Sequence, residues 1–205
     1  MSAPPKTRLV VDNAEAQAIR HAVAHANVRL LGAQYVIADA AHADALVRLL
    51  SDPRVSDPIY DLPRPVTHAN VRRWVADARL AHARGEAILC VMLDAAGVAT
   101  GYSYFTIWPQ FSAAEIGGAH RADGQSKGLG GAGALRSFGW MFEHLGVRLI
   151  CLTAARNNVR SARLITHAGF RPMGERVSTR PDGSTRESLY WEMTRDEWRA
   201  RYPAG

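Results

Sequence analysis

The chain has 205 residues, of which 47% are hydrophobic and 21% are charged. This length and composition suit one soluble globular domain and argue against intrinsic disorder. No apolar run approaches the roughly 18 residues that span a bilayer, and the first residues, MSAPPKTRLVV, lack the apolar core of a secretory signal. The net charge of +6 favours an anionic partner, but the arginines are scattered, so neither a nucleic-acid partner nor a membrane partner is predicted.

The two cysteines, Cys90 and Cys151, each lie in an apolar stretch. Buried free thiols are therefore predicted, together with a reducing, cytoplasmic location. The sequence has no CxxC pair and no Cys/His cluster, so no metal site is predicted. His21 and His25 have the i, i+4 spacing of metal ligands, but the sequence offers no third ligand for them.

The first half of the chain predicts a helix, a strand, two further helices and an antiparallel hairpin. The helices follow capping residues and end at glycine or proline, and the hairpin has two β-rich runs around Ala96-Gly97. A segment with four prolines, 51–67, is predicted to be loop throughout. The predicted ranges are 14–31, 40–52 and 68–84 for the helices, 35–40 for the strand, and 87–94 with 98–108 for the hairpin.

The second half predicts a strand, a helix, a buried strand, a helix and a terminal hairpin, followed by a short helix. Gly146 closes the first of these helices, Asn157 or Asn158 caps the second, and Thr194 caps the last. The predicted ranges are 113–120, 129–145 and 147–155, then a helix ending at 168–169 and a hairpin turning at 181–183. This order of elements predicts one α/β domain without internal repeats.

Residues 125–133 read QSKGLGGAG and open the predicted helix 129–145. Glycines at a helix start expose backbone N–H groups, which typically bind phosphate. The run fits GxGxxG at Gly128, Gly130 and Gly133, the dinucleotide-binding pattern. It also fits [R/Q]-x-x-G-x-[G/A] at Gln125, Gly128 and Gly130, which is typical of a coenzyme A pyrophosphate site. The two interpretations imply different enzymes.

The dinucleotide interpretation lacks its usual surroundings. A strand should lead directly into the glycines, and an acidic residue should follow the next strand to bind the ribose. Here the preceding residues, HRADGQSK, are polar, and the strand LICLTAA ends at Arg156 with no carboxylate. Arg156 could serve a 2′-phosphate, so an NADP-binding oxidoreductase remains as an alternative.

From Tyr35 to Trp198 the chain resembles the GNAT N-acetyltransferases, in particular their RimJ/RimL-like branch. The resemblance depends on the strand AEIG before the glycine loop, on Asn158-x-x-Ser161 after LICLTA, on the Ala168-Gly169-Phe170 sequence, on SDPRV at 51–55 and on LYWEMTRDEW near the end. It implies an α/β (α+β) fold with a mixed, mainly antiparallel, central sheet flanked by helices. The implied domains are a partly helical N-terminal extension, 1–34, and one acetyltransferase domain, 35–205.

The resemblance also implies acetyl-CoA as acyl donor. Glycine backbone at the helix start would hold the pyrophosphate, and the positive end of the helix would add to the attraction. Backbone of the strand near Ile116 would donate to the thioester oxygen, and Asn158 would bind the pantetheine arm. The expected cofactor-binding residues are Gln125, Ser126, Lys127, Gly128, Leu129, Gly130, Gly131, Ile116, Gly117, Gly118, Asn158 and Ser161.

Acetyl transfer to an amine needs a base, and Glu115 is the first candidate because it lies on the strand that lines the acyl end. His120 is a second candidate because the usual pKa of histidine suits proton transfer. Many GNAT proteins have a tyrosine that acts as the general acid seven residues after the asparagine, but here that position is Ile165. Ser161 is the remaining candidate for the acid. Each of these residues also has a purely structural interpretation, as an outward strand residue, a loop histidine or a first-turn serine.

The substrate pocket is expected between the proline-rich loop with its following helix and the terminal hairpin. Its candidate recognition residues are Asp57, Tyr60, Asp61, His68, Tyr102, Tyr104, Trp108 and Tyr190. The predicted substrate is a primary amine, either on a small molecule or at a protein N-terminus. A non-catalytic coenzyme A sensor is the alternative of a different class. The first 34 residues could cover the pocket, form a homodimer contact or have no role.

Overall fold

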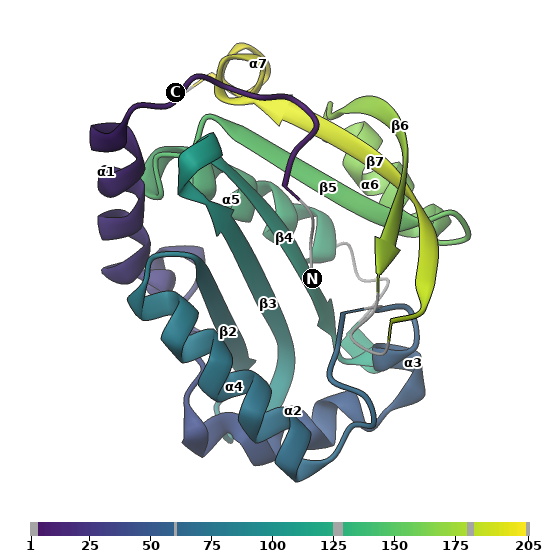
Figure 1. Cartoon of the computed structure of the whole chain (residues 1–205). Helices are drawn as coiled ribbons and strands as arrows, with labels where there is room; N and C mark the ends of the chain where they lie inside the picture. The colour runs from purple at the N-terminus through teal and green to yellow at the C-terminus, as the bar shows by residue number, and fades with distance from the viewer. Residues whose placement is uncertain (1–3, 60, 125–128, 180–182, 204–205) are drawn as a thin grey trace.

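The computed structural model, which describes residues 4–59, 61–124, 129–179 and 183–203, is built around one seven-stranded sheet (Figure 1). The strands lie in the order β1-β2-β3-β4-β5-β7-β6; β4 and β5 pair in parallel and the other neighbours are antiparallel. Their bounds are β1 Tyr35–Ile37, β2 Ala87–Leu93, β3 Ala99–Trp108, β4 Ala113–His120, β5 Leu149–Ala155, β6 Arg171–Thr179 and β7 Thr185–Thr194. The predicted mixed, mainly antiparallel α/β fold is confirmed.

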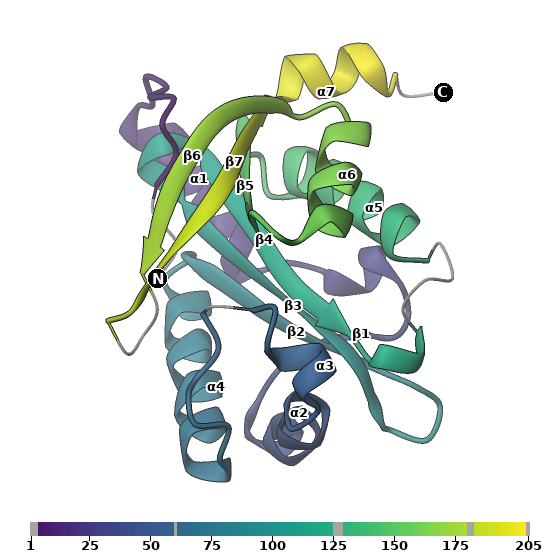
Figure 2. The ribbon, with the colours of Figure 1, turned by 90° about the vertical axis from the view of Figure 1, so that its right-hand side faces the viewer.

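Helices cover both faces of the sheet (Figure 2). One core joins the sheet to α1, α5, α6 and α7, and a second core joins it to α2, α3 and α4; we call these sides the α5 face and the α4 face. The bounds are α1 Asn13–Ala24, α2 Ala43–Leu50, α3 Pro53–Ser56, α4 His68–Ala83, α5 Leu129–His144, α6 Val159–His167 and α7 Arg195–Arg201. None of the helices in the described ranges combines the length and the apolar character needed to cross a membrane.

Local capping chemistry sets most helix ends as the sequence predicts. Thr67 accepts a hydrogen bond from the backbone N–H of Asn70 at the start of α4, and Asn158 accepts one from Ser161 at the start of α6. The last helix, α7, begins with a capping box between Thr194 and Glu197. These bonds satisfy N–H groups that the first helical turn leaves without partners.

Two local predictions are wrong. Residues 51–67 were expected to be loop, but Pro53–Ser56 form α3, because Asp52 caps the helix and proline fits its first turn. The first helix was expected to reach Leu31, but α1 ends at Ala24 and a separate 3₁₀ helix covers Val28–Leu31. Asn27 caps that second helix through its side chain. The alanine-rich pattern therefore runs through two separate helices.

The two central parallel strands separate soon after they pair. Residues Ala113–Glu115 of β4 pair with Leu149–Cys151 of β5, whereas β4 continues to His120 and β5 to Ala155. Beyond Glu115, no strand of the described ranges pairs with the edge of β4 that faces β5. A split therefore opens in the middle of the sheet.

The segment before α1 lies across β7 on the α4 face (Figure 1). The backbone N–H of Lys6 donates to Glu192 Oε1 (2.8 Å) and to the Tyr190 hydroxyl (3.1 Å), and Thr7 donates to both carboxylate oxygens of Glu192. Pro4 accepts from Arg176 of β6. We call residues 4–10 the strap. It covers Tyr190 and Glu192, which are fully buried.

Candidate active site

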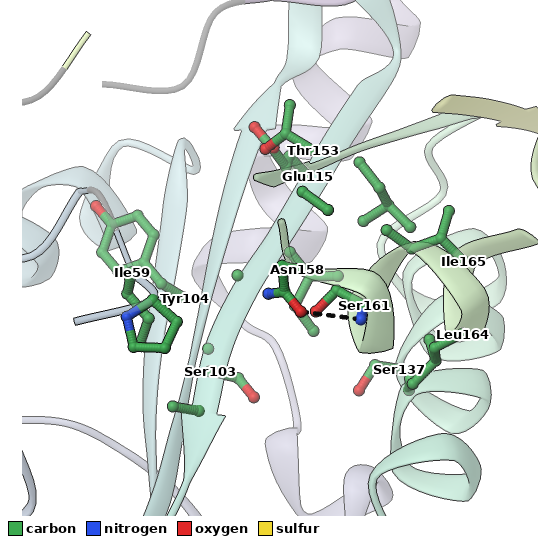
Figure 3. Close-up of a pocket in the computed structure, with 18 of the residues that line it drawn as sticks. Ile59, Ser103, Tyr104, Glu115, Ser137, Thr153, Asn158, Ser161, Leu164 and Ile165 are labelled. Carbon is green, nitrogen blue, oxygen red and sulfur yellow. Dashed lines mark hydrogen bonds between the residues drawn. The ribbon is translucent and has the colours of Figure 1, made fainter. Parts of the chain in front are cut away.

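A cavity of about 260 Å³ passes through the split between β4 and β5. In Figure 3, Ile59 and Tyr104 lie at one side of it and Ser137 and Leu164 at the other. Alternation along β3 and β4 explains the division, because successive side chains of a strand point to opposite faces. The cavity therefore has one wall on the α5 face and one on the α4 face.

The α5-face wall comes from the N-terminal parts of two helices, α5 and α6. Asn158 caps α6 by accepting from the N–H of Ser161 (3.1 Å), which fixes its amide at the cavity edge (Figure 3). Ser161 also lines the cavity. On α5, Gly133 and Ser137 are four residues apart, so both face the cavity from the same side of the helix. No local sequence pattern marks Ser137 as a site residue.

Two glycines of α5 leave its backbone accessible. A Cβ built on Gly131 or Gly133 would meet no other atom within 4 Å, so packing does not require glycine at either position. Glycine inside a helix costs about 0.5–1 kcal/mol relative to alanine, and here it leaves open space beside the cavity. This space, the helix start and the unpaired edge of β4 fit a ligand with a phosphate group and an extended arm. Coenzyme A has this form.

Part of the predicted cofactor loop lies outside the described residues, namely Gln125, Ser126, Lys127 and Gly128. Leu129 and Gly130 form the first residues of α5. On β4, Ile116, Gly117 and Gly118 all line the cavity as predicted. Gly118 also has a structural requirement, since a Cβ there would come within 2.4 Å of the Tyr102 carbonyl oxygen, whereas a Cβ on Gly117 would meet nothing within 4 Å.

Glu115 lies where the two strands part. Its side chain is 6% exposed, lines the cavity and accepts a hydrogen bond from Thr153 Oγ1 (2.8 Å) across from β5. Because Leu152 and Ala154 pack in the α5-face core, Thr153 and its partner Glu115 point to the α4 face. The negative charge of Glu115 contributes, after burial, to raising the pKa of the neighbouring Cys151 thiol. Sequence reasoning missed Thr153, because only the strand register brings it to Glu115.

The other predicted candidates for proton transfer are also at the cavity. His120 lies five residues beyond Glu115 on β4 and therefore faces the opposite side of the sheet. Burial, and then Arg160, lowers its pKa below the usual histidine value. Ile165, at the position where many GNAT proteins have tyrosine, is buried on α6 and lines the cavity. It cannot donate a proton.

The α4-face wall combines the loop after α3 with β3 and β7. Asp61 is partly buried there beside Tyr102 and Tyr104, whose pKa values are raised by burial and next by the charge of Asp61. Burial also raises the pKa of Asp61 itself, although its own backbone N–H and nearby positive charges, Arg186 among them, act in the opposite direction. Tyr104 stacks on Trp74 of α4, with ring centroids 5.9 Å apart.

The remaining candidates for substrate recognition lie elsewhere or are not described. Asp57 is exposed and lies 3.8 Å from Arg64 in an ion pair, and His68 bonds to Asp44 on the surface. Trp108 is at the far end of β3, opposite Ala113, and Tyr190 is buried below the strap. Tyr60 lies outside the described residues. Sequence reasoning missed Arg186, which lines the cavity from β7.

No group of three or more His, Cys, Asp or Glu side chains suited to a metal ion occurs within the described ranges. His21 and His25 lie with their rings 4.2 Å apart, and His25 Nδ1 is 2.9 Å from the backbone oxygen of His21. This local contact accounts for their spacing on α1. Cys90 and Cys151 are both buried and free, as predicted.

A family model described as the acetyltransferase (GNAT) domain matches residues 16–171 of the chain. No curated protein sequence matches it. Three solved structures share its fold: a ribosomal-protein-S5-alanine acetyltransferase from Vibrio fischeri, the ribosomal L7/L12 alpha-N-protein acetyltransferase RimL in complex with coenzyme A, and Mycobacterium smegmatis RimJ in complex with CoA-disulfide. Their TM-scores are 0.67, 0.67 and 0.68, at 17%, 20% and 16% identity. The matches cover 80%, 80% and 83% of this chain and 93%, 93% and 84% of those chains.

Proposed function

The chain belongs to the GNAT acetyltransferase family, and we propose that it transfers an acetyl group from acetyl-CoA to a primary amine. The observation that supports this most is the cavity through the split between β4 and β5. It joins a wall suited to coenzyme A on the α5 face to a wall with two carboxylates, Asp61 and Glu115, on the α4 face. Donor and acceptor would then approach the same point from opposite sides of the sheet.

On the α5 face, the start of α5 would hold the pyrophosphate, and the amide of Asn158 would bind the pantetheine arm. Bound acetyl-CoA supplies the thioester and a thiol leaving group whose usual pKa is about 8.5. The unpaired backbone of β4 from Ile116 onward would donate to the thioester oxygen as charge develops on it. The predicted loop residues before Leu129 would complete this site.

Glu115 would act as the base. It would accept a proton from the acceptor ammonium or from the attacking amine, either directly or through one water molecule. The amine nitrogen then forms a bond to the carbonyl carbon, the C–S bond breaks, and the thiolate leaves. Thr153 holds Oε1 of Glu115, which orients the carboxylate toward the α4 face. His120 is less suited to this role because it faces the other side of the sheet.

The departing thiolate would take a proton from water or from Ser161. The side chain of Asn158 accepts a hydrogen bond from the backbone N–H of Ser161, and the hydroxyl of Ser161 makes no hydrogen bond within the described part of the chain. Ile165 supplies no proton. A thiol is a good enough leaving group that this chemistry does not require a strong acid.

Structural relatives described as acting on ribosomal proteins suggest a protein N-terminus as one acceptor class, and a small-molecule amine is the other. A coenzyme A sensor without turnover is the alternative function. The predicted NADP site has no support from the family match.

The domain boundary at residue 34, a homodimer and a cytoplasmic location remain predictions. The first 34 residues do take part in the fold, because α1 and the 3₁₀ helix after it contribute four side chains to the α5-face core, namely Ile19, Val23, Val28 and Leu31.

Thermal unfolding with acetyl-CoA, coenzyme A and NADPH, followed by turnover with a panel of amines, tests the proposal. Ligand at a hundred times its Kd stabilises the folded state by about 2.7 kcal/mol, which shifts Tm measurably. We expect stabilisation by acetyl-CoA and coenzyme A and release of free thiol only when an amine is present. Stabilisation without thiol release would favour the sensor, and stabilisation by NADPH alone would overturn the coenzyme A site.

A further inference from the structure

The α4-face wall holds more charge than acetyl transfer to a simple amine requires. Glu115 is sufficient as a base, yet Asp61 places a second carboxylate in the same cavity. The two residues come from different elements, β4 and the loop after α3. The surroundings of Asp61 show what such a carboxylate would bind.

The position of Asp61 relative to Glu115 follows from the strand register. Asp61 lies beside Tyr104 and Tyr102, which pair with Gly117 and Ala119 of β4. These partners are two and four residues beyond Glu115. At about 3.3 Å per residue, the two carboxylates are roughly 7–13 Å apart along the strand.

Gly117 forms the floor between these two carboxylates. It is on the same face as Glu115, is exposed, and a Cβ on it would meet nothing within 4 Å. Tyr104 forms the side wall and is held in place by its stacking on Trp74. A slender chain could therefore lie along β4 from Glu115 to Asp61 without meeting a side chain from Gly117.

Asp61 has no ion pair with the residues that the structure describes. Within the described ranges no Lys, Arg or His side chain forms an ion pair with it at 4.0 Å or less. Arg186 approaches the same region but donates to the Pro58 carbonyl (3.1 Å) and to Ser188 Oγ (3.2 Å). Burial raises the pKa of Asp61 despite nearby positive charges, Arg186 among them, so the carboxylate would gain from a bound cation. The face of an aromatic ring attracts cations as well, and Tyr104 lies on this wall.

We propose that the acceptor carries a second cation, which Asp61 and the ring of Tyr104 bind while the reacting amine lies at Glu115. The substrate class is then a slender dication, such as an α,ω-diamine or a peptide with a basic side chain near its amino end. This inference rests on the proposed function for the identity of the reacting site. The recognition of the second cation can be measured without turnover.

The test is isothermal titration calorimetry on the protein loaded with coenzyme A, which cannot transfer acetyl. The two probes are 1,6-diaminohexane and 6-aminohexan-1-ol, which differ in one terminal group, ammonium against hydroxyl. We expect the wild type to bind the diamine about tenfold more tightly, since a partly exposed ion pair with a cation–π contact contributes roughly 1.4 kcal/mol. Asp61→Asn should bind both probes equally.

Asp57→Asn is the matched control. Asp57 is on the same loop and has the same charge, but it is exposed and does not line the cavity, so the preference for the diamine should remain. Asp61→Glu, which moves the carboxylate by one methylene, should retain the preference and shift it to a shorter diamine. Circular dichroism of each variant shows that it is folded.

Equal affinity of the wild type for the two probes would overturn the proposal, and so would a preference that persists in Asp61→Asn. A separate assay of thiol release from acetyl-CoA tests the proposed function. If amines are acetylated without a preference for the diamine, the enzyme assignment stands and the second-cation site fails. If the diamine binds through Asp61 and no thiol is released, the reverse holds.

Discussion

The two walls of the cavity are built from different kinds of chemical group. On the α5 face they are glycine backbone, an amide and a small hydroxyl from the N-terminal parts of two helices, as at Gly133, Asn158 and Ser161. On the α4 face they are charged and aromatic side chains from a loop and three strands, as at Asp61, Tyr104 and Glu115. A wall of backbone suits a ligand that never changes, whereas a wall of side chains can change with the substrate while the fold stays the same.

The largest effect should come from the α4 face. Glu115→Gln removes the proposed base but keeps the size of the side chain and a hydrogen-bond acceptor for Thr153. Loss of a general base lowers kcat by about 10²–10⁴-fold. Steady-state kinetics with a saturating amine, together with calorimetry of coenzyme A binding, should show a reduced kcat and an unchanged Kd for coenzyme A.

Thr153→Val is the companion variant for this measurement. It removes the hydrogen bond to Glu115 and leaves the carboxylate in place, so kcat should fall less and its pH profile should move. If Glu115→Gln has the same kcat as the wild type, Glu115 is not the base. His120 on the α5 face would then be the next candidate to test.

The walls also differ in how far the sequence predicts them. The α5-face wall depends on local signals: a cap at Asn158, a glycine run before a helix and a closing glycine, Gly146. Each involves neighbours within a few positions, so the pattern contains the information. The same holds for the hairpin around Ala96-Gly97 and for the capping box at Thr194.

The α4-face wall depends on register between distant segments. Thr153 and Glu115 are 38 residues apart, and nothing in either local pattern indicates that they bond. The contact of the strap with Glu192 spans 185 positions or more. The α3 error has a different cause: proline can end a helix or begin one, and the sequence pattern does not show that Asp52 caps a helix that begins at Pro53.

The second-largest effect is a loss of stability at the strap. It distinguishes the strap from the cavity wall, although both lie on the α4 face. Glu192 is fully buried and accepts hydrogen bonds from Lys6, Thr7 and Tyr190. Glu192→Gln loses the charge of this acceptor, and hydrogen bonds to charged groups contribute about 1.5–3 kcal/mol each to stability. We expect the free energy of unfolding to fall by about 2 kcal/mol while kcat is retained.

The same residue predicts a pH dependence. Burial by itself raises the pKa of Glu192, but the hydrogen bonds from Thr7 and Tyr190 outweigh it and lower the pKa below the usual value of a glutamate. A carboxyl whose pKa is depressed on folding stabilises the folded state above its unfolded pKa, and this contribution is lost as the pH falls through the folded value. Urea unfolding from pH 6 to pH 3 should show a steeper loss of stability in the wild type than in Glu192→Gln. Parallel curves would mean that the strap does not depend on the ionised carboxylate.

A third change tests the α5-face wall. Gly133→Leu places a side chain into space that the fold leaves open, and leucine is a better helix former than glycine. The protein without ligand should therefore become slightly more stable, while its affinity for acetyl-CoA falls at least about tenfold, or roughly 1.4 kcal/mol. Thermal unfolding measures the first effect and calorimetry the second.

Gly139→Ala on the same helix is the control for Gly133→Leu. Gly139 does not line the cavity, and a Cβ there would lie 3.4 Å from the ring of Trp198, an ordinary van der Waals contact. It should raise stability and leave acetyl-CoA affinity unchanged. Equal affinity in both variants would show that the glycines of α5 serve the helix rather than a ligand.

The smallest effect concerns the stability cost of the α4-face wall. Because burial raises the pKa of Asp61, its charged form is disfavoured in the folded protein; the contribution of this group to stability is complete below its unfolded pKa and is lost as the pH rises through the folded value. Asp61→Asn should therefore raise Tm slightly at pH 7 and show no such gain near pH 3, where the carboxyl is protonated. Thermal unfolding at the two pH values measures the difference. A residue whose removal stabilises the protein is typical of a binding site that is incomplete without its ligand, because the fold gains nothing from the charge. A lower Tm for Asp61→Asn at pH 7 would instead assign Asp61 a structural partner and make the two walls alike in serving the fold.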